Sequence, residues 1–150
     1  MASLAIILSF AQLFLFNSEE KQTLIFRHSF TSMEVRHTTL SSSHPVIFPR
    51  NVIASASIGD VKILSIDNAI DPDSLSSLIK DKDIKSYLFV GPSASSQQIS
   101  LIAMQRDFKK IILHSGIGKN KKAEILDLLP KSLHQKVYSL RESGSFETDL

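Results

Sequence analysis

The sequence of 150 residues contains no cysteine. This absence excludes disulfides, thiolate metal sites and a cysteine nucleophile, and it is compatible with a reducing compartment. Five histidines are present, but none lies at metal-ligand spacing from another ligand. A serine–histidine–acid triad is not readable either, so the sequence offers no pattern for covalent catalysis.

Acidic residues are scarce in the first part of the chain. Of fifteen Asp and Glu residues, only Glu19, Glu20 and Glu34 come before Asp60. The net charge of +2 is too small to indicate nucleic-acid binding by itself. A hydrophobic content of 43% and a charged content of 21% are ordinary for one globular domain.

The first 59 residues divide into two stretches. Residues 4–16 form an apolar run that is too short to span a bilayer comfortably. No Lys or Arg comes before it, and residues 17–20 make a poor cleavage site, so secretion is the less favoured interpretation. Residues 33–57 are rich in Ser and Thr and carry Arg36 and Arg50 with one acid, which is the composition of an organelle transit peptide.

A plastid-like processing site at residues 52–56 fits this interpretation, and Met33 is an alternative start of translation. An untargeted, disordered leader fits equally well, because Ser, Thr, His and Pro bury little apolar surface. We therefore expect a plastid protein if the source is a plant, or otherwise a cytoplasmic one. In both cases residues 1–59 are expected to be a leader, disordered over 33–57, and residues 60–150 the folded domain.

Apolar runs alternate with helical patterns from Asp60 onward. The expected strands are residues 61–66, 87–90, 110–113 and 136–140, and the helices between them start at 71, 97 and 122. This alternation predicts an α/β fold, a three-layer sandwich with a mostly parallel, Rossmann-like sheet. Residues 141–150 carry no further strong pattern, so the chain looks truncated inside a motif.

Carboxylates follow two of the expected strands. Asp67 comes after the first strand, and Glu142, Glu147 and Asp149 come after the fourth. The carboxyl ends of parallel strands share one edge of a sheet, and gathered carboxylates suit Mg²⁺ or Mn²⁺. The alternative is a set of surface carboxylates near turns.

Residues 115–120 (Ser-Gly-Ile-Gly-Lys-Asn) resemble a phosphate loop. The Walker pattern fails, because Leu113 and Asn120 stand where it needs Gly and Ser or Thr. A tight strand-to-helix turn explains the glycines as well. Lysines flank this loop and either contact nucleic-acid phosphates or form a solvated face: Lys109, Lys110, Lys119, Lys121 and Lys122.

Five segments in this order resemble the bacterial-type PIN-like nuclease domains. They are Ile-Asp at 66–67, Leu-Phe-Val-Gly at 88–91, Met-Gln at 104–105, the loop 115–120, and residues 141–147. The similarity is colinear over roughly residues 60–150, and the loop is its most specific part. The family's Glu-Asn pair after the first Asp is here Ala69-Ile70, and the last segment has Glu for Asp and an additional serine.

The resemblance implies a metal-dependent ribonuclease that uses Mg²⁺ or Mn²⁺ and single-stranded RNA. It implies Asp67, Glu142 and Glu147 as catalytic metal ligands, and Lys119, Lys121 and Lys122 as contacts to RNA. The family's helix acid is Ala123 here, so Glu124 would serve as the remaining ligand, rotated by ~100° around the helix. The rival hypothesis is a non-catalytic, organelle-targeted α/β binding or scaffold domain.

Overall fold

The computed structural model describes residues 21–80 and 86–150. The apolar run 4–16 lies outside the described residues. Within them, no helix combines the length and the apolar character needed to cross a bilayer.

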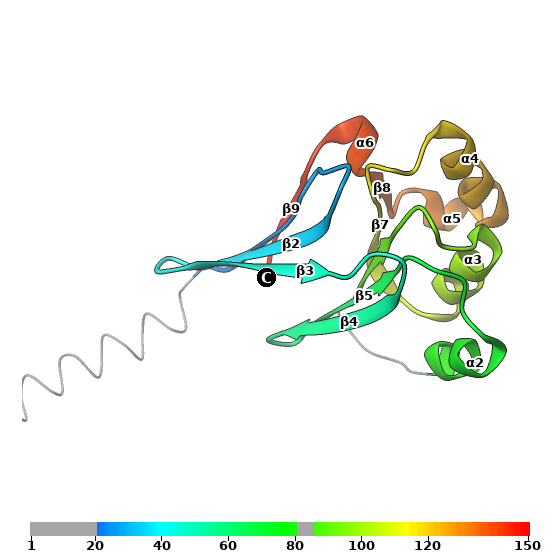
Figure 1. Ribbon diagram of the computed structural model, residues 1–150, viewed down its shortest axis with the longest axis horizontal. Helices are drawn as coiled ribbons and strands as arrows, with labels where there is room; N and C mark the ends of the chain where they lie inside the picture. Colours follow the sequence, from blue (N-terminus) through cyan, green and yellow to red (C-terminus); the bar gives the residue numbers. More distant parts are fainter. Residues whose placement is uncertain (1–20, 81–85) are drawn as a thin grey trace, which may run out of the picture.

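A five-stranded sheet forms the centre of the molecule (Figure 1). Its strands lie side by side in the order of the chain: β4 (Ile53–Ile58), β5 (Val61–Ile66), β6 (Ser86–Val90), β7 (Phe108–Leu113) and β8 (Val137–Ser139). Strands β5 to β8 are parallel, whereas β4 runs antiparallel to β5. The prediction of an α/β fold with a mostly parallel sheet is confirmed, and β4 is an addition that the sequence patterns did not indicate.

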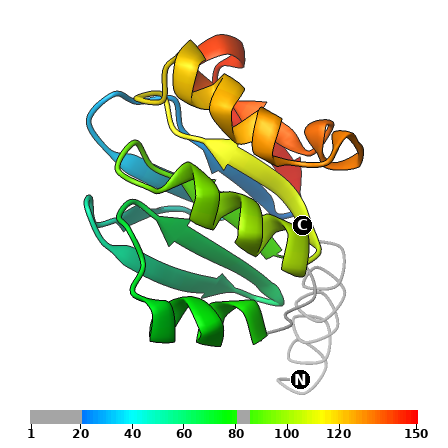
Figure 2. The ribbon, with the colours of Figure 1, turned by 90° about the vertical axis from the view of Figure 1, so that its right-hand side faces the viewer.

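The crossover helices lie on one face of this sheet (Figure 2). They are α2 (Pro72–Lys80), α3 (Ser96–Gln105), α4 (Lys119–Leu128) and the short α5 (Lys131–His134). Because the order of the strands never reverses and parallel crossovers share one hand, successive helices fall on the same side. Alternate strand residues such as Leu64, Leu88 and Ile111 pack beneath Ile99 and Ile125 of these helices.

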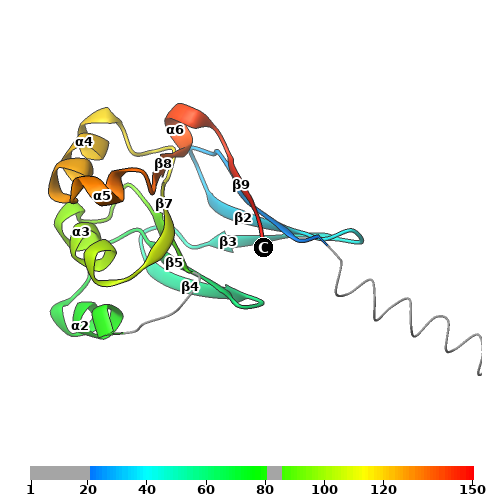
Figure 3. The same cartoon turned by 180° about the vertical axis from the view of Figure 1, so that it is seen from behind.

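A second, antiparallel sheet covers the opposite face (Figure 3). Its strand order is β3-β2-β1-β9, built from β1 (Thr23–Phe26), β2 (Met33–Thr38), β3 (Ser43–Phe48) and β9 (Phe146–Asp149). The other set of alternate residues of the central sheet, including Ile63, Phe89 and Ile112, packs against Phe26 and Met33. The two sheets therefore share a core of their own.

The prediction that residues 33–57 are disordered is wrong. Strands β2 and β3 lie in that segment and β4 begins in it, and its buried members include Met33, Val35 and Phe48. The Ser- and Thr-rich composition suggested disorder, but a strand with one buried face needs an apolar residue only at every second position. The folded unit therefore extends to the amino-terminal side of Asp60.

The end of the chain is also more structured than expected. After β8 come helix α6 (Leu140–Ser143) and strand β9, which pairs with β1. Phe146 in β9 packs on the ring of Tyr138 with 4.9 Å between centroids. A four-residue strand with one exposed face has too weak a pattern to be recognised without its partner.

Candidate functional site

Asp67 lies at the carboxyl end of β5, as the sequence predicted, and its side chain is buried. Its Oδ2 accepts hydrogen bonds from Nε of Arg50 at 2.8 Å and from the backbone N–H of Asn51 at 2.7 Å. Its Oδ1 accepts from the backbone N–H of Ser93 at 2.9 Å. The carboxylate thus joins the loop between β3 and β4 to the loop after β6.

These contacts keep Asp67 ionised. Burial by itself raises the pKa of the carboxyl, but the hydrogen bonds from Arg50, Asn51 and Ser93 outweigh it, with help from the charge of Arg50. The net result is a pKa below the ordinary value of 3.8. Arg50 is the residue that sequence reasoning missed here, because it lies in the segment assigned to the leader.

Gly91 follows β6 and lies against Asp67. A Cβ atom built on Gly91 would lie 2.2 Å from Oδ1 of Asp67. Only glycine therefore allows the carboxylate to approach this strand end so closely, and the glycine that ends the second predicted strand has a packing role.

His114 follows β7 and is buried. Its Nδ1 accepts from the backbone N–H of Gly116 at 3.0 Å, so Nε2 carries the proton and donates to the carbonyl of Ser32 at 2.9 Å. Burial is the main cause of a lowered pKa for this imidazole, which favours the neutral form. His114 is thus a neutral link between the parallel sheet and the turn that joins β1 to β2.

Ser115 makes a second link between the same segments. Its hydroxyl oxygen accepts from the backbone N–H of Ser29 at 3.2 Å, and its carbonyl accepts from Nη1 of Arg141 at 3.4 Å. The turn at residues 27–32, the start of the loop 115–120 and helix α6 therefore meet at one end of the molecule (Figures 1 and 3).

The three lysines predicted to contact RNA have different surroundings. The ammonium of Lys121 is half-buried and donates to the carbonyls of Pro92 and Ala94, and burial lowers its pKa. Lys122 pairs with Glu142. Lys119 is exposed at the first position of α4, close enough to Glu142 to lower the pKa of that carboxyl together with Lys122.

The predicted metal ligands other than Asp67 lie in separate surroundings. Glu142 is in α6 beside Lys122, Glu124 is exposed on α4, and Glu147 is exposed in β9 opposite Ile25 of β1. Within residues 21–80 and 86–150, no three His, Cys, Asp or Glu side chains are grouped as a metal site requires.

In this arrangement the carboxylate oxygens of Asp67 do not fit the coordination of a divalent cation. Both carboxylate oxygens accept hydrogen bonds, and the guanidinium of Arg50 already supplies the neighbouring positive charge. A metal ion would have to displace Arg50, so we derive no metal-dependent step from this geometry.

An exposed aromatic residue lies at the same end of the molecule. Phe30, at the tip of the turn between β1 and β2, is 60% exposed. The ring of His28 lies edge-on to it at 5.2 Å between centroids, and the guanidinium of Arg141 lies over it at 5.9 Å. No local sequence pattern indicates this grouping, because Phe30 and Arg141 are distant in the chain.

Comparisons with protein-family models, curated proteins and solved structures found no match to this chain.

Proposed function

We propose that this chain binds single-stranded RNA at the end of the molecule where Phe30, Arg141 and Lys119 lie, and that it does so without cutting the RNA. The observation that carries the proposal is the exposed ring of Phe30 with His28 and Arg141 against it. We call this surface, made of His28, Phe30, Lys119 and Arg141, the Phe30 surface.

An exposed aromatic ring with an arginine guanidinium against it suits an unstacked base and its phosphates. A base stacked on such a ring contributes ~1–3 kcal/mol, and nearby basic side chains track the backbone. A base within a duplex has no free face for Phe30, which is why single-stranded RNA is the expected partner. The exposed carboxylate of this region, Glu142, is paired with Lys122, so it repels phosphate less.

The backbone under the Phe30 surface is well supported. His114 holds the carbonyl of Ser32, and Ser115 holds the N–H of Ser29, one residue before Phe30. A turn anchored on both sides presents its aromatic ring with little loss of conformational entropy on binding. This rigidity favours a binding role for the surface.

The proposal includes a distant PIN-like relationship at the level of the fold. Two facts support it: Asp67 directly follows a parallel strand, and residues 115–120 run from the loop after β7 into the first turn of α4. The three-layer arrangement of the PIN-like class belongs to this proposal too. A targeting role for the segment before Asp60 is less favoured, since cleavage within 52–56 would remove strands β1 to β3 and their buried side chains.

Fluorescence anisotropy with a labelled oligouridine RNA tests the binding proposal. We expect binding that weakens as salt rises, and a loss of several-fold or more for Phe30→Ala and for Arg141→Ala. Lys109→Ala is the matched control, because Lys109 is exposed near the opposite end of β7. Undetectable binding at low salt, or equal affinity in Phe30→Ala and the wild type, would overturn the proposal.

A metal-dependent ribonuclease is the second candidate, favoured by the position of Asp67 at the carboxyl end of β5. The test is cleavage of single-stranded RNA with and without Mn²⁺, with Asp67→Asn alongside. Mn²⁺-dependent cleavage by the wild type that is absent from an Asp67→Asn protein with an unchanged circular dichroism spectrum would establish the nuclease. Equal signals from both proteins would remove it and leave the binding proposal standing.

A further inference from the structure

Strand β4 forms an edge of the central sheet. Among the described residues it pairs only with β5, so its other side has no strand beside it. Its sequence is Ile-Ala-Ser-Ala-Ser-Ile, six residues without a charge or a proline. Soluble monomers usually protect such an edge with charges, proline or shortness, because an open ladder pairs readily with another chain.

The other three sheet edges in the described part of the chain do carry such protection. Strand β3 contains Pro45, β9 carries Glu147 and Asp149, and β8 is three residues long. Strand β4 therefore differs from them in offering an uncharged ladder of ordinary length.

The register of the hairpin shows which groups of β4 point outward. The carbonyl of Val52 accepts from the N–H of Asp67 at 3.1 Å, and hydrogen-bonded pairs in an antiparallel ladder recur at every second residue. Val52, Ala54 and Ala56 thus direct their backbone groups to β5. The N–H and C=O groups of Ile53, Ser55 and Ser57 point away from it.

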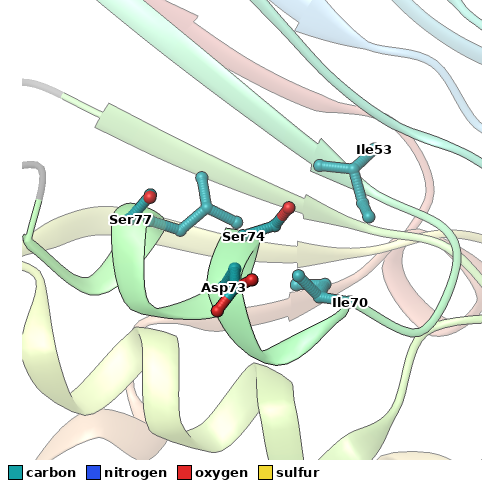
Figure 4. A pocket seen from close by; sticks show the side chains of 6 residues that line it. Ile53, Ile70, Asp73, Ser74 and Ser77 are labelled. Atoms are coloured by element: carbon teal, nitrogen blue, oxygen red, sulfur yellow. The ribbon is translucent and has the colours of Figure 1, made fainter.

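An open hollow lies beside this edge on the helix side of the sheet (Figure 4). It has a volume of about 580 Å³, and its apolar lining comes from Ile53, Ile70 and Leu78. Helix α2, which forms its other wall, contains three apolar residues but no buried one. The apolar side of α2 is therefore only partly covered by its own chain.

We propose that β4 pairs antiparallel with β4 of a second copy of this chain, with the two-fold axis at Ser55. The outward residues are symmetric about Ser55, so pairing Ser55 with Ser55, and Ile53 with Ser57, uses the outward groups of both copies. Because β4 carries no charge, its pairing with β4 of a second copy brings no like charges together. The side chains of Ile53, Ser55 and Ser57 project on the side of the sheet where the hollow lies. In the dimer each copy therefore covers the partly exposed side of α2 that lines the hollow of the other copy.

Disulfide trapping tests this register directly, because the native chain has no cysteine. In the proposed dimer the two Ser55 Cα atoms lie ~5.5 Å apart, within the range for a disulfide, whereas the two Ser57 Cα atoms lie ~14 Å apart. We therefore expect Ser55→Cys to oxidise to a covalent dimer on a non-reducing gel. The matched control Ser57→Cys, on the same strand and the same face, should stay monomeric on that gel.

Sedimentation of the full chain gives an independent test. We expect a dimer for the wild type and for Ser41→Lys in the exposed turn between β2 and β3, and a monomer with an unchanged circular dichroism spectrum for Ser55→Lys. A wild type that sediments as a monomer at ~100 μM, a scale at which weak interfaces associate, would overturn the proposal. Equal trapping of Ser55→Cys and Ser57→Cys, or a dimer that persists in Ser55→Lys, would overturn it as well.

Discussion

Arg50 donates a 2.8 Å hydrogen bond to the buried carboxylate of Asp67. Arg50 lies in the loop before β4, and Asp67 lies at the end of β5. The charge of Asp67 is thereby balanced within the chain. The PIN-like resemblance assigns Asp67 to metal binding, but here its carboxylate pairs with Arg50. The contribution of this pair to the stability of the fold can be measured.

We expect Asp67→Asn to lower the free energy of unfolding at pH 7 by about 2–3 kcal/mol, because the substitution leaves Arg50 without its counter-charge. Arg50 is 31% exposed, so solvent moderates the loss. The lowered pKa of Asp67 adds a pH signature. A depressed carboxyl pKa stabilises the fold above the unfolded value and loses that contribution as pH falls below about 3.8.

Urea titrations at pH 7 and at pH 3 measure both effects. The wild type should lose more stability than Asp67→Asn between these two values. Parallel acid profiles for the two proteins would mean that folding does not lower the pKa of Asp67.

We expect Gly91→Ala to be severely destabilising, by about 3 kcal/mol or more, since its methyl group would overlap Oδ1 of Asp67. Gly118→Ala is the matched control, because a Cβ atom there meets nothing within 4 Å. Thermal denaturation of both variants decides the matter, and a Gly91→Ala protein as stable as Gly118→Ala would contradict the close approach seen here.

His114 should make the protein less stable in mildly acidic solution. Its pKa is lowered from 6.5 in the folded state, so the unfolded chain takes up a proton first and stability falls as pH drops below about 6.5. The decline ends at the lower folded pKa. Comparing urea midpoints at pH 7.5 and 5.5, we expect His114→Gln to show a smaller difference than the wild type, and the exposed His44→Gln to behave like the wild type.

Replacing each of two phenylalanines, four positions apart, by alanine should change the free energy of unfolding by very different amounts. Phe26 is fully buried between the two sheets, and Phe26→Ala should cost about 3–5 kcal/mol. Phe30 is 60% exposed, so Phe30→Ala should change stability by less than about 0.5 kcal/mol while it impairs RNA binding. Chemical denaturation measures both, and a small effect at Phe26 would show that the second sheet contributes little to the core.

The parallel strands β5, β6 and β7 were predictable because each has buried residues on both faces. Strands β6 and β7 read as continuous apolar runs, Tyr87 to Val90 and Ile111 to Leu113, and such runs carry their own signal. The crossover helices followed from their apolar spacing, and α3 was expected to start at residue 97 and starts at Ser96 in the structure.

The antiparallel part was not predictable from composition. Strand β4 alternates Ala and Ser between two isoleucines, which looks like a flexible serine-rich segment. The overlooked signal is the turn after it, where Gly59 with a φ of +59° and Asp60 join two strands as a two-residue hairpin. The prediction of a disordered leader gave the serine-rich composition more weight than this turn signal.

Half of the candidate site was visible in the sequence and half was not. Strand order along the chain placed Asp67 and the loop 115–120 at the edge where the parallel strands end, since parallel strands end together. Arg50 and Phe30 come from antiparallel strands and turns, whose position over that edge depends on how two sheets pack. Such long-range packing has no local pattern.

The pairing of β1 with β9 has a consequence for how the protein is made. Ile25 lies opposite Glu147, so the second sheet joins the two ends of the described chain. Strands β1, β2 and β3 can associate soon after synthesis, but β9 emerges from the ribosome long after them. Contacts of such high sequence separation form slowly. The nascent protein therefore carries an open edge at β1 until β9 has been synthesised and can pair with it.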